Sequence, residues 1–203
     1  RRVRAMQLVP IDDPSDPRIA AYRDIRERDL VGRQGRFIAE GKVVLETLLA
    51  SSRFEAESVM VLQSRLAGLS EILAKAPSGL PIYVVAGPVM DEVAGFPVHR
   101  GILAIGRRPP VTDAGRLLAS LPTRALALVL VGISNHDNIG SIFRNAAAFG
   151  ADAIFLDRTC CDPLYRKAIR VSTGSVLRVP YAIFDDSAAF AGILAENGFE
   201  SFA

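Results

Sequence analysis

The chain has 203 residues, of which 50% are hydrophobic and 23% are charged, and its formal net charge is +2. This composition excludes global disorder and allows one large domain or two of about 100 residues each. The net charge alone identifies no nucleic-acid partner, although residues 1–36 carry nine arginines against six acidic residues.

The cysteines, histidines and apolar runs exclude several classes of protein. Cys160 and Cys161 are the only cysteines, and neighbours in sequence rarely bridge, so we expect a reducing compartment. His99 and His136 do not combine with them at a spacing typical of zinc sites, so no metal is expected. The N-terminus lacks the apolar core of a signal peptide, and no apolar run approaches the ~20 residues of a membrane span. We therefore predict a soluble, cytoplasmic protein.

The first half of the chain alternates between strand and helix patterns. Residues 1–15 are expected to be extended, and residues 16–29 to form a helix that begins with Asp16 and Pro17 and buries Ile19 and Tyr22. The expected strands after a glycine- and arginine-containing loop are 36–41, 57–63, 81–86 and 101–107. The expected helices are 42–51, 65–76 and 88–95. The alternation from Phe37 to Arg107 predicts a small α/β/α sandwich, and with the N-terminal extension it makes up a first domain of residues 1–107.

A second alternating block follows residues 108–124, which hold three prolines and read as a linker with a short helix. Residues 125–132 are apolar on both faces, as in a central parallel strand. The other expected strands are 153–157, 176–184 and the start of one at 199–203, and the expected helices are 139–149, the first half of 162–175, and 187–197. The predicted second domain, residues 125–203, is α/β with a small parallel sheet that looks cut short.

The sequence lacks the motifs of several enzyme classes, and its main candidate for a functional site is one polar turn. The sequence has no dinucleotide fingerprint, no P-loop and no hydrolase nucleophile elbow. The turn Ser134–Asn138 follows the strand 125–132, and ligands of open α/β sheets bind beyond the carboxyl ends of strands. Asn138 is predicted to cap the next helix, a role that does not exclude a functional one. His136 is interpreted as a loop residue rather than a general base.

Arg144 is a single cation in a helix that is otherwise almost uncharged. Ile139, Ile142, Phe143, Ala146 and Phe149 are predicted to form the buried stripe of this helix. The positions that share the face of Arg144 all carry small residues; they are Gly140, Ser141, Ala147 and Ala148. Two interpretations remain open: Arg144 is a solvated surface residue, or another backbone or a ligand approaches closely here.

The pattern from Asn138 through Gly140 and Arg144 to Gly150, N-x-G-x-x-x-R-N-A-A-A-F-G, resembles the first motif of the SpoU-type 2′-O-ribose RNA methyltransferases of the SPOUT class. Residues 162–181 resemble the segment that follows this motif, and residues 36–51 resemble the start of the family's N-terminal RNA-binding domain. The resemblance implies an L30e-like α/β/α sandwich followed by a Rossmann-like methyltransferase domain that closes as an α/β knot.

The resemblance also implies a reaction and its residues. The family transfers a methyl group from S-adenosylmethionine to a ribose 2′-hydroxyl of RNA. By the same resemblance, the separate N-terminal domain favours ribosomal RNA over transfer RNA as the substrate. Arg144 would activate the hydroxyl, and Asn138 would support the site. A free arginine is not a base, because its pKa exceeds ~12. We therefore expect Arg144 to stabilise developing negative charge, with proton relay through a phosphate left open.

Two groups of cations are candidate RNA contacts. Arg166, Lys167 and Arg170 share one face of a predicted helix, and Arg33 and Arg36 lie in the glycine-containing loop. Phosphate contact and a simply solvated helix surface both fit the first group. No aromatic residues are interleaved with either arginine of the loop, so no base-stacking platform is predicted there.

The sequence departs from the family pattern at its end. The family binds the cofactor in the C-terminal knot through a G-x-E loop followed by an S-L-N-V-type segment. This combination is absent here, so we expect the cofactor-binding residues beyond Ala203. Homodimerisation through that knot is expected only where the knot is present, and these 203 residues alone are expected to bind little cofactor and to be inactive. The alternatives are a non-catalytic RNA-binding protein with an L30e-like module, a transfer-RNA 2′-O-methyltransferase and an α/β enzyme of small molecules.

Overall fold

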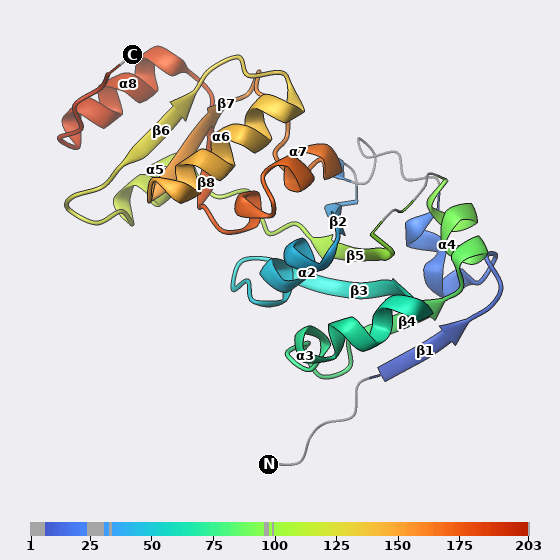
Figure 1. Cartoon of the computed structure of the whole chain (residues 1–203). Coiled ribbons are helices and arrows are strands. Elements are labelled where there is room, and N and C mark those ends of the chain that lie inside the picture. The colour runs from blue at the N-terminus through green and yellow to red at the C-terminus, as the bar shows by residue number, and fades with distance from the viewer. Residues whose placement is uncertain (1–6, 24–30, 33, 96–97, 99, 203) are drawn as a thin grey trace.

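The computed structural model of the chain contains two α/β units that follow each other in sequence (Figure 1). The structure describes residues 7–23, 31–32, 34–95, 98 and 100–202. The first unit has a five-stranded sheet and the second a three-stranded sheet. The strand–helix alternation of the sequence predicted both units.

The first sheet contains one strand more than predicted. Its strands are β1 (Gln7–Ile11), β2 (Arg36–Glu40), β3 (Glu55–Leu62), β4 (Pro81–Val85) and β5 (Ile102–Arg107), in the order β1-β4-β3-β5-β2. The added strand, β1, comes from the segment expected to be extended, and it pairs in parallel with β4. Only β5 is antiparallel to its neighbours, so the carboxyl ends of the other four strands share one edge with the amino end of β5.

Helices cover both faces of this sheet, as the predicted sandwich requires. Along β2, Phe37 and Ala39 enter one hydrophobic core and Ile38 enters the other, since successive strand residues point to opposite faces. The first core lies under α2 (Lys42–Leu49), the 3-10 helix η2 (Gln63–Leu69) and α3 (Ser70–Leu73), and the second under the 3-10 helix η1 (Pro17–Tyr22) and α4 (Gly87–Ala94).

The helix predicted over residues 16–29 is a shorter 3-10 helix, η1, in its described part. Asp16 caps it by accepting a 2.8 Å hydrogen bond from the Arg18 amide, and Ile19 and Tyr22 are buried as predicted. Arg23 ends the helix because its backbone is extended and its guanidinium donates to the carbonyl oxygens of Pro14 and Asp16. Residues 24–30 lie outside the described residues.

The second unit has three parallel strands, β6 (Ala127–Leu130), β7 (Ala153–Asp157) and β8 (Tyr181–Phe184), in that order. Its helices are α5 (Ala114–Ala119), α6 (His136–Ala148), α7 (Arg166–Val171), the 3-10 helix η3 (Ser175–Leu177) and α8 (Ser187–Glu196). α5 is the short helix expected in the linker.

Three expectations for this unit were wrong. Among the described residues β6 is an edge strand rather than a central one, and Val129 and Val131 are exposed. The strand predicted from 176 begins only at Tyr181, because η3 comes first and Pro180 has no N–H to donate to a ladder. No strand forms at 199–202, because the Phe199 amide instead donates to the carbonyl oxygen of Leu194 and closes the end of α8.

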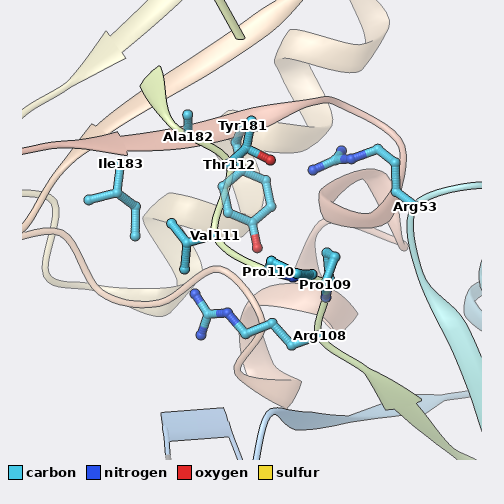
Figure 2. A pocket seen from close by; sticks show the side chains of 9 residues that line it. All are labelled: Arg53, Arg108, Pro109, Pro110, Val111, Thr112, Tyr181, Ala182 and Ile183. Atoms are coloured by element: carbon cyan, nitrogen blue, oxygen red, sulfur yellow. The ribbon is translucent and has the colours of Figure 1, made fainter. Parts of the chain in front are cut away.

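The two units share a hydrophobic core and several polar contacts. The core that contains Phe37 and Leu45 of the first unit also contains Phe143 and Ile169 of the second. Around it, Arg108 Nη1 lies 2.5 Å from Asp162 Oδ2. Figure 2 shows the small cavity at this junction, where the ring of Tyr181 packs beside linker residues 108–112.

Arg53 completes the junction from the first unit. Its Nη1 donates a 3.0 Å hydrogen bond to the carbonyl oxygen of Val179, and its guanidinium lies 5.5 Å from the centre of the Tyr181 ring. Burial lowers the pKa of Arg53 and raises that of Tyr181. These contacts fix how the second unit sits on the first.

We expect Arg108→Ala to lower the free energy of unfolding by about 1 kcal/mol, because it leaves a half-buried Asp162 carboxylate without its charged donor. Urea unfolding measures this loss. The matched control is Arg158→Ala, which removes a pair with Asp185 whose side chains are both 72% exposed. Exposed pairs contribute little, so the control should change stability by less than about 0.5 kcal/mol. Equal losses in the two variants would contradict the role of Arg108 at the junction.

A candidate active site on helix α6

Helix α6 begins at the turn that follows β6, and Asn135 is its N-cap. The side-chain oxygen of Asn135 accepts hydrogen bonds from the amides of Asp137 at 2.7 Å and Asn138 at 3.4 Å. The prediction that Asn138 caps the helix was therefore wrong, because the helix starts three residues earlier than expected. Asn138 is the third helical residue, and its side chain is exposed.

This difference gives a test that separates the two asparagines. Asn135→Ala should lower the free energy of unfolding by about 1 kcal/mol, because two amides at the helix start lose their acceptor. Asn138→Ala should leave stability within about 0.3 kcal/mol of wild type, as is usual for an exposed substitution. Urea unfolding of both variants measures the effects. A larger loss of unfolding free energy for Asn138→Ala than for Asn135→Ala would mean that Asn138 is the helix cap.

Asp157, at the end of β7, holds the β6–α6 turn in place. One carboxylate oxygen accepts hydrogen bonds from the amides of Gly132, Thr159 and Cys160, at 3.0 to 3.2 Å, and the Thr159 hydroxyl donates to both oxygens. Burial raises the pKa of this carboxyl, but these hydrogen bonds outweigh it and the pKa is lowered. Asp157 thus joins the carboxyl ends of two neighbouring strands, a role that the sequence analysis missed.

His136 is the first residue of α6 rather than a loop residue. Its ring lies 4.6 Å from that of Tyr165, centre to centre, with an angle of 48° between the planes. Its Nε2 is buried, and among the described residues it has no hydrogen-bond partner. The ring contact attaches the start of α6 to the segment that leads into α7.

The predicted buried stripe of α6 is confirmed except at its end. Ile139, Phe143 and Ala146 are buried, and Ile142 is partly buried against the same core. Phe149 is 81% exposed, because it follows the last helical residue and the left-handed Gly150 then turns the chain away. The 3.6-residue period ends with the helix, so Phe149 no longer shares its buried face.

Arg144 lies on the exposed side of α6. Within the described part of the chain, its side chain makes no hydrogen bond and no ion pair. The close approach suggested by its small neighbours occurs one turn earlier, at Gly140. A Cβ atom there would lie 2.8 Å from both the carbonyl oxygen of Ala168 and the Cβ of Val171, so helix α7 occupies that space. A backbone, rather than a ligand, therefore accounts for the glycine.

The three candidate RNA contacts of α7 lie together beside α6, and each has different surroundings. Arg166 Nη1 lies 3.4 Å from Glu40 Oε2 at the end of β2, and Lys167 Nζ lies 2.6 Å from Asp137 Oδ2 in α6. Arg170 is exposed. The structure thus places this group at the carboxyl edge of the first sheet, next to the start of α6.

The other two candidates do not join this group. Arg36 starts β2, so it lies about 13 Å along the strand from Glu40. Its Nε is 2.7 Å from Glu57, which also binds Arg107 at 2.9 Å. Arg33 lies outside the described residues.

The described residues contain no group of three or more histidine, cysteine or acidic side chains placed to hold a metal ion. None of their helices is both long and apolar enough to cross a membrane. A cofactor pocket buries most of its ligand, whereas the side chains of Asn138 and Arg144 are exposed. The described residues therefore do not by themselves enclose a cofactor next to Arg144.

Comparison with known proteins assigns the fold to a family. Residues 125–203 match the model of the SpoU rRNA Methylase family. An uncharacterized tRNA/rRNA methyltransferase of Mycobacterium bovis is 42% identical over 202 residues, which are 98% of this chain and 68% of the relative. The chain belongs to the SpoU rRNA methylase family. The resemblance seen in the sequence is thereby confirmed.

Solved structures agree with this SpoU assignment. A structure titled RNA 2′-O ribose methyltransferase matches with a TM-score of 0.69 and 26% identity, over 93% of this chain and 70% of that one. An AdoMet-bound rRNA methyltransferase from Sinorhizobium meliloti matches with a TM-score of 0.71 and 20% identity, over 94% and 70% of the two chains. The mixed α/β fold of both units is therefore that of SpoU methyltransferase structures.

Proposed function

We propose that this SpoU protein transfers a methyl group from S-adenosylmethionine to a ribose 2′-hydroxyl of structured RNA, and that its substrate is ribosomal RNA. The observation that carries the proposal is Arg144, exposed and without an ion pair among the described residues, in a motif of a helix that starts at the carboxyl edge of a parallel sheet. The similar solved structure titled RNA 2′-O ribose methyltransferase supports the position of the methyl group.

Arg144 suits a reaction in which negative charge develops on an oxygen. The 2′-oxygen forms a bond to the methyl carbon as the bond from that carbon to sulfur breaks. The sulfur keeps the electron pair of the broken bond, and the hydroxyl proton passes to water. Arginine presents five N–H donors and does not deprotonate. A donor aimed at the 2′-oxygen stabilises it more strongly as its charge grows, which lowers the barrier. An arginine already paired with a carboxylate would be a weaker donor, and Arg144 has no such partner within the described residues.

The residues around Arg144 would hold the RNA. Arg170 is exposed on α7, which packs against α6 at Gly140, and it is free to meet a phosphate. Lys167 would exchange its pair with Asp137 for a phosphate. Asn138 is exposed about 1.7 turns before Arg144 and does not cap the helix. We assign Asn138 a supporting contact to the substrate.

S-adenosylmethionine supplies the methyl group in this proposal. The similar rRNA methyltransferase structure with AdoMet (S-adenosylmethionine) bound supports this donor. We assign none of the described residues to the cofactor, because they do not enclose a ligand beside Arg144. A preference for ribosomal over transfer RNA is a part of the proposal that the family name supports. Homodimerisation through a C-terminal knot is a further part, and it rests on the family resemblance alone.

The test uses protein expressed from its complete gene, incubated with methyl-labelled S-adenosylmethionine and either ribosomal or transfer RNA. The RNA is then digested with alkali, which requires a free 2′-hydroxyl at the cleaved linkage. Label in alkali-resistant dinucleotides of ribosomal RNA is the expected result. Label in mononucleotides would mean base methylation, and label in transfer RNA alone would change the substrate. No label in either RNA, with RNA still bound, would favour a non-catalytic RNA-binding protein.

A further inference from the structure

The proposed reaction releases a proton from the 2′-hydroxyl, and Arg144 does not accept it, because a guanidinium carries donors only. A base next to the water that takes this proton would speed the transfer, since general bases act within hydrogen-bond reach or through one water. Histidine, aspartate and glutamate are the side chains that most often do so. The acids and the histidine around the start of α6 are therefore the candidates.

Most of these groups are already engaged or buried. Asp157 accepts hydrogen bonds from three amides and one hydroxyl, and the half-buried Asp162 is bound by Arg108. The side chain of Glu40 is only 6% exposed. The Nε2 atom of His136 is buried, so a substrate on the surface of α6 does not reach it.

Asp137, the second residue of α6, is the acid of this region that stays accessible. Its side chain is 47% exposed, and among the described residues its one partner is Lys167 of the adjacent helix α7, whose Nζ lies 2.6 Å from Oδ2 (Figure 1). Lys167 is 51% exposed, and exposed ion pairs contribute little to stability. The pair is therefore easily exchanged when a phosphate binds Lys167.

Helical register places Asp137 on the same face of α6 as Arg144. Seven residues are almost two full turns, so the two side chains leave the helix in nearly the same direction, about 10.5 Å apart along its axis. Side chains of a helix lean toward its N-terminus, so a long side chain at position 144 covers part of that distance. Ser141 lies between them, and within the described part of the chain its hydroxyl makes no hydrogen bond.

We infer that Asp137 is the proton acceptor of the reaction, acting through one water that is bound by its carboxylate and by the Ser141 hydroxyl. The inference rests on the proposed function for the reaction itself. As the 2′-oxygen bonds to the methyl carbon, its proton passes to this water, and the water passes one of its own protons to the carboxylate. The resulting carboxylic acid releases the proton to solvent, because Asp137 is exposed. Arg144 stays protonated throughout, and no phosphate has to carry the proton.

The ion pair with Lys167 couples this base to the substrate. Without RNA, the adjacent ammonium group stabilises the charged carboxylate and makes it a poorer proton acceptor. A phosphate that binds Lys167 competes for that ammonium group and leaves the carboxylate to the water. Asp137 itself repels phosphates, so RNA affinity alone does not account for an acid among these cations.

The experiment uses protein from the complete gene and measures both the methylation rate at saturating ribosomal RNA and the half-saturating RNA concentration. Asp137→Asn should lower the rate by about 10²-fold or more, the usual contribution of a general base, without raising the half-saturating concentration. Lys167→Met should raise that concentration and lower the rate by much less than Asp137→Asn does. Glu196→Gln, which changes an exposed acid of α8, is the control and should alter neither quantity.

Added formate gives a second readout that a purely structural role of Asp137 would not affect. Asp137→Ala leaves space for a small carboxylate, so formate should raise its rate at least tenfold and should not raise the rate of Arg144→Ala. Asp137→Glu keeps the carboxylate and should retain more of the rate than Asp137→Asn. Thermal unfolding checks that all variants fold.

Two results would overturn the inference. One is a rate for Asp137→Asn within threefold of wild type. The other is an equal loss of rate in Asp137→Asn and Lys167→Met with no effect of formate, which would make Asp137 only the partner of Lys167. If wild type and Asp137→Asn both label the ribose at similar rates, the inference alone fails. If wild type labels no ribose, the proposed function fails and the inference fails with it.

Discussion

Arg144→Ala should reduce the methylation rate of the complete protein at saturating RNA by about 10² to 10³, the usual effect of removing one donor that stabilises a developing oxyanion. Its stability should not change, because the side chain is exposed and makes no hydrogen bond or ion pair among the described residues. Rates of label transfer into alkali-resistant dinucleotides measure the first effect, and thermal unfolding measures the second.

The control for Arg144 keeps the charge and changes the geometry. Arg144→Lys retains a cation but replaces a planar fork of five donors with one ammonium group. We expect it to recover part of the lost rate, because a point charge still favours an anionic oxygen. If Arg144→Ala kept its rate and raised only the RNA concentration needed for saturation, Arg144 would be an RNA-binding residue. A rate within threefold of wild type with unchanged RNA affinity would contradict both roles.

Local patterns in the sequence predicted the features that depend on local physics. The apolar period of residues 139–146 predicted the buried face of α6, and Ile139 and Phe143 are fully buried. Asp16 and Pro17 predicted the start of η1. The helix cap was misplaced from Asn135 to Asn138, because the polar turn contains four side chains that can cap a helix. Only the backbone geometry selects Asn135.

Contacts between distant segments were beyond prediction from patterns. Glu40 and Arg166 are 126 residues apart in sequence, and no local signal connects them. The same holds for the Asp157 carboxylate and the Gly132 amide, 25 residues apart. The sequence did contain one signal for the role of Asp157. This acidic residue ends an apolar strand, and Thr159, two positions later, suits a turn. Lys42, Arg65 and Arg100 likewise come to one edge of the first sheet only because β5 runs antiparallel to its neighbours.

Gly140 gives the largest expected effect on stability. Gly140→Val should lower the free energy of unfolding by about 3 kcal/mol, because overpacking a tight contact typically costs 1–3 kcal/mol and the added Cβ would meet the backbone of α7. Gly140→Ala should cost less, about 1 kcal/mol, since the better helix propensity of alanine offsets part of the clash. Urea unfolding should therefore rank the stabilities wild type, Ala and Val.

The matched control is Gly192, which lies inside α8 with open space around a would-be Cβ. Gly192→Val should change stability by less than about 0.5 kcal/mol, and Gly192→Ala should raise it by about 0.5–1 kcal/mol. If Gly140→Ala were stabilising as well, α7 would not approach α6 as closely as the structure shows. Because α7 carries Arg166, Lys167 and Arg170, displacing it should also weaken RNA binding. Gly140 therefore connects the packing of the motif helix to the cations proposed to hold the substrate.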